Sequence, residues 1–190
     1  LFILAMITPV SAELRTINKG ATIFIGESNL DITNAVGSST KIGWWASGST
    51  STNPDFVMDI SSKYKSFTVD QDTFVSRTGN WYALTETNNK QDVVFNVKDP
   101  QLSVAAWDFV QQKDVTGLNV VHGGHLGVKI TTNMYAATNP QYRPNANAAT
   151  DGYIKIKVKD ESGAQLSNLL MGTSGSTTST STLNQYVSTQ

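Results

Sequence analysis

Two carboxylates spaced one residue apart are the first candidates for chemistry in this chain. Asp70 and Asp72 stand in the stretch Val69-Asp-Gln-Asp-Thr-Phe74, and in an extended strand they would point to the same side. Paired carboxylates hold Ca²⁺, and they also form the acid–base pair of glycosidases. Phe74 and Val75 occupy the later positions of a calcium loop, so that motif is incomplete. Two interpretations stay open: a calcium site at Asp70 and Asp72, or surface acids that flank a turn.

The two histidines of the chain form a second candidate. His122 and His125 lie three residues apart in Val121-His-Gly-Gly-His-Leu126. Two imidazoles on a turn could share a metal ion, and one could act as a general base. No Asp or Glu between Thr116 and Thr150 supplies a third ligand nearby. A turn with two exposed histidines explains the segment equally well, and we assign no metal to it.

A pair of tryptophans precedes a polar loop. Trp44 and Trp45 are adjacent, and adjacent residues of a strand face opposite sides, so we expect one ring in the core and the other outside. An outward tryptophan beside a polar loop suits a surface that binds carbohydrate or docks a protein. Tyr82 is a further candidate for stacking on a sugar. The alternative is that loops cover all of these rings.

The sequence contains no catalytic signature. The nucleophile elbow Gly-x-Ser-x-Gly, the phosphate-binding loop, the dinucleotide fingerprint Gly-x-Gly-x-x-Gly and the zinc motif His-Glu-x-x-His are all missing from it. We therefore predict no catalytic residue and no enzyme activity. A hydrolase that uses Asp70, Asp72 or a histidine is the weakest of the functions considered.

Composition narrows the class of protein. The net charge of −1 gives no reason to expect a nucleic-acid partner. Charged residues make up 15% of the chain, well below the roughly 25% of average globular proteins. Because the chain has no cysteine, disulfides, thiolate zinc sites and a cysteine nucleophile are excluded. Calcium is the one ion that we consider, and no other cofactor is predicted.

Alternation of apolar and polar residues predicts strands almost throughout. It is clear at 56–60, 93–97 and 126–130, and clearest in Tyr153-Ile-Lys-Ile-Lys-Val-Lys159, where isoleucine and valine alternate with lysine. Turn residues separate these runs at the spacing typical of a sandwich or barrel. The stretch 106–113 has room for a short helical turn only. The pattern predicts an all-β fold.

Two β domains are expected to follow a short leader. The apolar run 1–12 ends in Val10-Ser11-Ala12, as the remnant of a secretory signal peptide would. An N-terminal β-sandwich is predicted for 13–113, with a boundary near 113–117. The cadence of 114–190 resembles an immunoglobulin-like sandwich with too few strands, so we expect it to be incomplete. Its segment 172–182 is almost pure Ser and Thr.

Several short motifs, in order, resemble one known family. They are Gly20-Ala-Thr-Ile-Phe-Ile-Gly-Glu27 with Leu30-Asp31, Gly79-Asn-Trp-Tyr82, Val94-Phe-Asn-Val-Lys-Asp-Pro100, Asp114-Val-Thr-Gly117 and Ile130-Thr-Thr-Asn133. They are similar to an uncharacterised domain in secreted proteins of methanogenic archaea, and the resemblance covers roughly residues 14 to 170. It implies cell-envelope components with repeated Ig-like modules and Ser/Thr-rich regions, and it implies no enzyme activity.

The sequence thus predicts a secreted, non-enzymatic structural or interaction protein of an archaeal cell surface. Its expected partners are other envelope proteins or surface glycans, and within this chain we expect no integral membrane segment. The alternative is a secreted carbohydrate-binding module or adhesin that uses Trp44, Trp45 and Tyr82.

Overall fold

A computed structural model describes residues 15–47, 53–120 and 125–144 of the chain, together with Ser162 and short strands between Tyr153 and Tyr186. Most of the described elements are strands, as predicted, and the helices are short. The expected signal remnant 1–12 lies outside the described residues.

The first sheet has five strands in the spatial order β1-β5-β4-β2-β3. They are β1 (Ala21–Phe24), β2 (Lys41–Trp44), β3 (Phe56–Asp59), β4 (Gly79–Leu84) and β5 (Lys90–Lys98). Strand β1 pairs with β5 in parallel, whereas the other neighbours are antiparallel. The sheet is therefore mixed. Its parallel partners, β1 and β5, are separated in the sequence by the other three strands.

An aromatic cluster fills the core of this sheet. Trp81 on β4 stands opposite Phe95 on β5, and Phe74 packs against Trp81 with ring centroids 4.8 Å apart. Phe67 reaches Phe95 at 5.5 Å. Phe74 ends the short helix α2 (Gln71–Phe74). A second short helix, α1 (Thr33–Val36), contributes Ala35 and Val36 to the same apolar core. Burial of these rings is the main stabilising term for the first unit.

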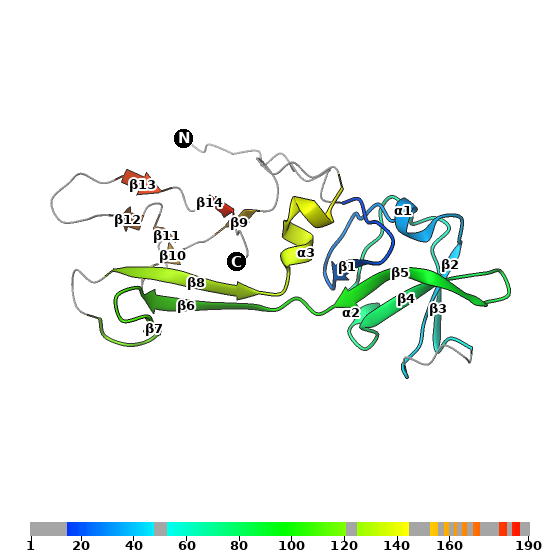
Figure 1. Cartoon of the computed structure of the whole chain (residues 1–190), viewed down its shortest axis with the longest axis horizontal. Coiled ribbons are helices and arrows are strands. Elements are labelled where there is room, and N and C mark those ends of the chain that lie inside the picture. The colour runs from blue at the N-terminus through cyan, green and yellow to red at the C-terminus, as the bar shows by residue number, and fades with distance from the viewer. Residues whose placement is uncertain are drawn as a thin grey trace.

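A second sheet begins where β5 ends. It contains β6 (Leu102–Asp108), β7 (Lys113–Asp114) and β8 (Leu126–Thr132) in the antiparallel order β7-β6-β8. The stretch 106–113, expected to have room for a helical turn, is strand as far as Asp108 and then turns. The change of sheet falls between Lys98 and Leu102, ahead of the expected boundary at 113–117. Figure 1 shows β6 and β8 extending away from the five-stranded sheet.

The chain returns to the first unit after β8. A helix, α3 (Tyr135–Thr138), and a 3₁₀ turn, η1 (Pro140–Tyr142), follow it, and α3 contacts β1 (Figure 1). Asn133 bridges the two linkers: its side-chain nitrogen donates to the Asp99 carbonyl at 2.8 Å, and its oxygen accepts from the Gln101 amide at 2.8 Å. The two sheets are therefore joined by two segments of backbone that hydrogen-bond to each other.

Short strands complete the described part of the chain. They are β9 (Tyr153–Lys155), β10 (Val158–Lys159), β11 (Gln165–Leu166), β12 (Leu169–Met171), β13 (Ser179–Ser181) and β14 (Asn184–Tyr186). They pair in antiparallel fashion as β9 with β14, β10 with β11, and β12 with β13. The strand expected at 153–159 is thus seen at both of its ends.

Among the described helices, none combines the length and the apolar character needed to cross a membrane.

Candidate functional site

Asp70 and Asp72, the two carboxylates considered as a calcium site, have different structural roles. Asp70 is the N-cap of α2, and its Oδ1 accepts a hydrogen bond from the Thr73 amide at 2.8 Å. Asp72 lies in the first turn of the same helix and is exposed. Because the segment turns into a helix after Asp70, the extended geometry that would place Asp70 and Asp72 on the same side is not present. The backbone geometry gives Asp70 a capping role.

No group of three or more His, Asp or Glu side chains in the described part of the chain is arranged to hold a metal ion. His122 lies outside the described residues. His125 is exposed, and its backbone carbonyl accepts a hydrogen bond from the Phe109 amide at 2.9 Å. Calcium at Asp70 and Asp72 stays a prediction.

The aromatic candidates have neighbours on their rings. Trp44 is half-buried, and its indole nitrogen donates to the Thr78 carbonyl at 2.8 Å. Trp45 is only 5% exposed and meets Tyr82 edge to face, with ring centroids 5.5 Å apart. The ammonium of Lys90 lies 4.6 Å from the centre of the Tyr82 ring. A sugar that stacks on Tyr82 would therefore have to displace Lys90.

Aspartates serve the architecture at several turns. Asp31, Asp59, Asp108 and Asp114 each accept a hydrogen bond from the backbone amide two residues further along the chain. These are Asx-type turns, in which the side chain replaces a backbone acceptor. Hydrogen bonding from Ser61 holds the pKa of Asp59 below its ordinary value, and hydrogen bonding from Thr116 does the same for the pKa of Asp114. These hydrogen bonds therefore favour the charged form of Asp59 and of Asp114.

A buried ion pair holds the segment after η1 against the end of β1. Arg143, which follows η1, is 1% exposed, and its Nη2 lies 2.9 Å from Glu27 Oε1. Glu27 Oε1 also accepts from the Phe24 amide at 3.0 Å, which ties the pair to the end of β1. Burial raises the pKa of Glu27, opposed by the charge of Arg143, and burial lowers the pKa of Arg143. The sequence gives no signal for this pair, because no local pattern links two residues so far apart.

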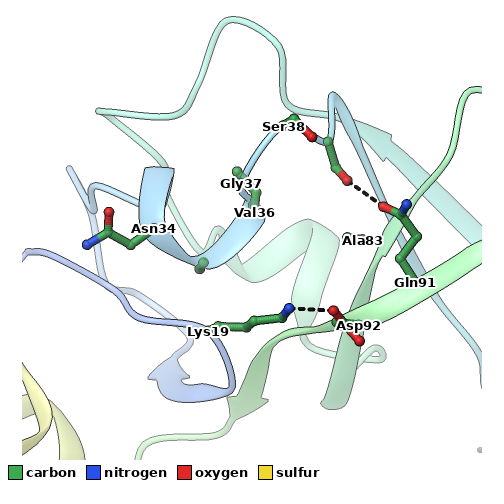
Figure 2. A pocket seen from close by; sticks show the side chains of 10 residues that line it. Lys19, Asn34, Val36, Gly37, Ser38, Ala83, Gln91 and Asp92 are labelled. Carbon is green, nitrogen blue, oxygen red and sulfur yellow. Dashed lines mark hydrogen bonds and ion pairs between the residues drawn. The ribbon is translucent and has the colours of Figure 1, made fainter.

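A polar pocket of about 290 Å³ opens beside α1. Figure 2 shows Asn34 and Val36 on one side of it and Gln91 and Asp92 on the other. Lys19 lies across the opening and forms an exposed ion pair with Asp92. At the far end the Ser39 hydroxyl donates to the Gln91 side-chain oxygen at 2.9 Å.

The chemistry of this pocket suits hydrogen bonding to a polar molecule. Amide, hydroxyl, ammonium and carboxylate groups surround an apolar floor that includes Ala35, Val36 and Ala83. Such a mixture can bind hydroxyl groups as donors and acceptors together. The residues come from four separate stretches of sequence, so only the folded chain brings them together.

One comparison identifies the family. The model of a domain of unknown function, DUF3821, matches residues 19–190. Because the match covers most of the chain, the chain belongs to this family. No curated protein matches the chain. The predicted membership of an uncharacterised domain family is confirmed, whereas the archaeal origin and the secretion stay predictions.

Proposed function

We propose that this chain, a member of the DUF3821 family, is a non-enzymatic structural and interaction module of a cell surface. The observation that carries the proposal is the structural role of its acidic side chains. Asp31, Asp59, Asp108 and Asp114 hold turns, Asp70 caps a helix, and Glu27 holds the returning segment through Arg143. Acidic side chains in these roles stabilise the fold, and a structural module of a cell surface needs a stable fold.

The joint between the sheets supports the same proposal. Two linkers run between the five-stranded sheet and the three-stranded sheet, and Asn133 bonds them together. Arg143 then fastens the returning segment to Glu27. Two linkers that hydrogen-bond to each other restrain this place more than a single linker would. A restrained pair of units would suit a module that spaces or aligns its neighbours in an envelope.

The location of the protein outside the cell is part of the proposal. It rests on the sequence Val10-Ser11-Ala12, on the lack of cysteine and on the small share of charged residues. We also propose that the second unit is an Ig-like sandwich, with the sheet of β6, β7 and β8 as one of its layers. A module of this kind would bind envelope proteins through its surfaces and strand edges.

Localisation on intact cells tests the proposal directly. Antibodies raised against this chain should label the outside of unbroken cells of its source organism, and the protein should sediment with envelope fragments. A brief protease treatment of intact cells should remove the label, while a cytoplasmic marker protein stays uncleaved. Label found only after the cells are broken would contradict the proposal.

A second candidate function is binding of a surface glycan. The polar pocket beside α1 favours it, since Asn34, Gln91 and Ser39 supply amide and hydroxyl groups at one place. This pocket is distinct from the aromatic residues Trp44, Trp45 and Tyr82, from which the sequence predicted the same function.

A glycan array with matched variants separates the two places. If the pocket binds, Asn34→Ala and Gln91→Ala should each lower the signal at least about 10-fold, which corresponds to a lost hydrogen bond of about 1.4 kcal/mol. Asn80→Ala, an exposed amide on β4 outside the pocket, is the matched control. Loss of binding with Tyr82→Ala alone would return the site to the aromatic residues, and an empty array would remove the glycan hypothesis.

A further inference from the structure

The polar pocket beside α1 receives two adjacent side chains from β5. Ala83 of β4 stands opposite both Gln91 and Asp92, where the register between the two strands shifts. Adjacent residues of a regular strand point to opposite faces of the sheet. A bulge of this kind re-aims one side chain, and Gln91 and Asp92 accordingly both line the pocket (Figure 2). The irregularity in β4 and β5 thus brings an amide and a carboxylate to one wall of the pocket.

The floor of the pocket is apolar and small. Ala35, Val36 and Ala83 form it, and they are 3%, 4% and 6% exposed. Because their neighbours already cover most of each residue, the floor has room for a small apolar group such as a methyl. None of the described residues that line the pocket is aromatic. A sugar ring has nothing to stack on here, so its apolar contact must come from a small substituent.

Gln91 supplies hydrogen-bond donors beside this floor. Its Oε1 accepts from the Ser39 hydroxyl at 2.9 Å, and Ser39 is only 9% exposed, so one end of the amide is held by a buried residue. The Nε2 group has two N–H donors, and no hydrogen bond within the described part of the chain uses them. A carbonyl oxygen of a ligand is a suitable acceptor for these donors.

The charges of the pocket cancel. Lys19 and Asp92 are the charged residues among its described lining, and they form an ion pair. Hydrogen bonding from Lys19 holds the pKa of Asp92 below its ordinary value, so the carboxylate is charged at neutral pH. One oxygen of Asp92 is bonded to Lys19, and the other can accept from a ligand hydroxyl. An acidic sugar or a protonated amino sugar would bring a charge without a counter-charge, and an uncharged ligand is favoured.

We propose that this pocket binds N-acetylated sugars through their acetamido group. The methyl lies on the floor, the carbonyl oxygen accepts from Nε2 of Gln91, and a neighbouring sugar hydroxyl donates to Asp92. The pocket volume of about 290 Å³ lies at the lower end of the range of small-molecule sites and suits one sugar residue. This inference rests on glycan binding at the pocket, the second candidate function above, and adds to it the class of sugar.

Three related sugars test the proposal by isothermal titration of the full chain. N-acetylglucosamine, glucose and glucosamine share one ring and differ at a single carbon, which carries an acetamido group, a hydroxyl or an ammonium. N-acetylglucosamine should bind at least about 10-fold more tightly than either of the others, because it adds a buried methyl group and an amide hydrogen bond without adding charge.

The outcomes separate this inference from glycan binding in general. Glucose or glucosamine bound as tightly as N-acetylglucosamine would overturn the role of the acetamido group, while glycan binding at the pocket would stand. Binding of none of the three sugars would also overturn the inference. The glycan array then decides whether the pocket binds a different class of glycan or none.

A matched pair of variants locates the contact. Gln91→Glu replaces the N–H donors with a carboxylate, so it should weaken binding of N-acetylglucosamine at least about 10-fold and strengthen binding of glucosamine. Gln71→Glu makes the same change at an exposed position of α2 outside the pocket and should alter neither affinity. Tryptophan fluorescence reports whether the first unit stays folded. Affinities that Gln91→Glu leaves unchanged, or that Tyr82→Ala abolishes instead, would overturn the proposal.

Discussion

Nη2 of Arg143 lies 2.9 Å from both carboxylate oxygens of Glu27, although 116 residues separate the two in the chain. Arg143 Nε and Nη1 are also buried and have no hydrogen-bond acceptor among the described residues. The pair therefore satisfies only part of the guanidinium group. This arrangement determines how the free energy of unfolding responds to substitution at the pair and to pH.

Single changes at the pair should be unequal in cost. Glu27→Leu leaves a buried charge without a partner and should lower the free energy of unfolding by about 3–5 kcal/mol. Arg143→Met removes the charge together with its unsatisfied donors and leaves only the Glu27 carboxylate, which is 19% exposed and keeps the Phe24 amide as a donor, so it should cost less, about 1–2 kcal/mol. The double variant should be more stable than the sum of the two losses predicts. Urea unfolding followed by tryptophan fluorescence measures all four proteins, and additive losses would show that the two residues do not interact.

The pH dependence of stability should change when Arg143 is removed. The pKa of Glu27 is raised by burial, and Arg143 opposes that rise. A carboxyl with a raised pKa binds more protons when folded, so its contribution to stability is present below the unfolded value of about 4.3 and is lost as pH rises through the folded pKa. In Arg143→Met the pKa should rise further, and the loss of stability with rising pH should be steeper than in the unmodified chain.

Unfolding of both proteins between about pH 3 and pH 8 checks this prediction. Asp31, Asp59 and Asp114 have lowered pKa values and lose their contributions as pH falls through the folded pKa. Because this loss is common to both proteins, it cancels in the difference between the two curves. A difference that does not depend on pH would contradict the prediction.

Capping by Asp70 can be separated from calcium binding. Asp70→Ala removes the acceptor of the Thr73 amide and should cost about 1 kcal/mol, while Asp70→Ser, another good cap, should recover most of it. Asp72→Ala, an exposed change in the same turn, should stay within about 0.5 kcal/mol of the unmodified chain. Thermal unfolding with and without added Ca²⁺ completes the comparison. An increase in Tm on adding Ca²⁺ that is lost in Asp70→Ala and also in Asp72→Ala would support the calcium site.

Two glycines of the sheets should tolerate a methyl group differently. A Cβ at Gly43 would lie 2.9 Å from Cδ1 of Leu84, which is buried, so Gly43→Ala should cost about 1–3 kcal/mol through overpacking. A Cβ at Gly127 would collide with the ring of Phe109. That ring is largely exposed and can swing into solvent, so Gly127→Ala should cost less than about 1 kcal/mol. Urea unfolding of the two variants gives the order, and a reversed order would contradict this account.

The strands were the most predictable part of the fold. Alternation of apolar and polar residue types predicted the strands β3, β5 and β8. The pairing of β1 with β5 was not predictable, since parallel partners can be far apart in sequence and leave no turn signal between them. The change of sheet ahead of Leu102 lies earlier in the chain than the domain boundary expected at 113–117, which stays a prediction.

The candidate sites show the same division. The adjacency of Trp44 and Trp45 predicts opposite faces, but only the folded chain places Tyr82 against Trp45 and Lys90 over Tyr82. Asp70 and Asp72 would share a side in an extended strand, but the start of α2 makes Asp70 a helix cap. The pocket beside α1 had no signal in the sequence, because its residues are polar, common and dispersed.

By itself, the sequence determined that this chain forms strands and has neither disulfides nor a known catalytic motif. These properties follow from local periodicity, residue counts and short motifs, which need no knowledge of distant contacts. Tertiary structure alone decided the order of strands, the partner of Arg143 and the role of each aspartate. Those depend on which surfaces meet when apolar groups leave water, and that is settled by the whole chain at once.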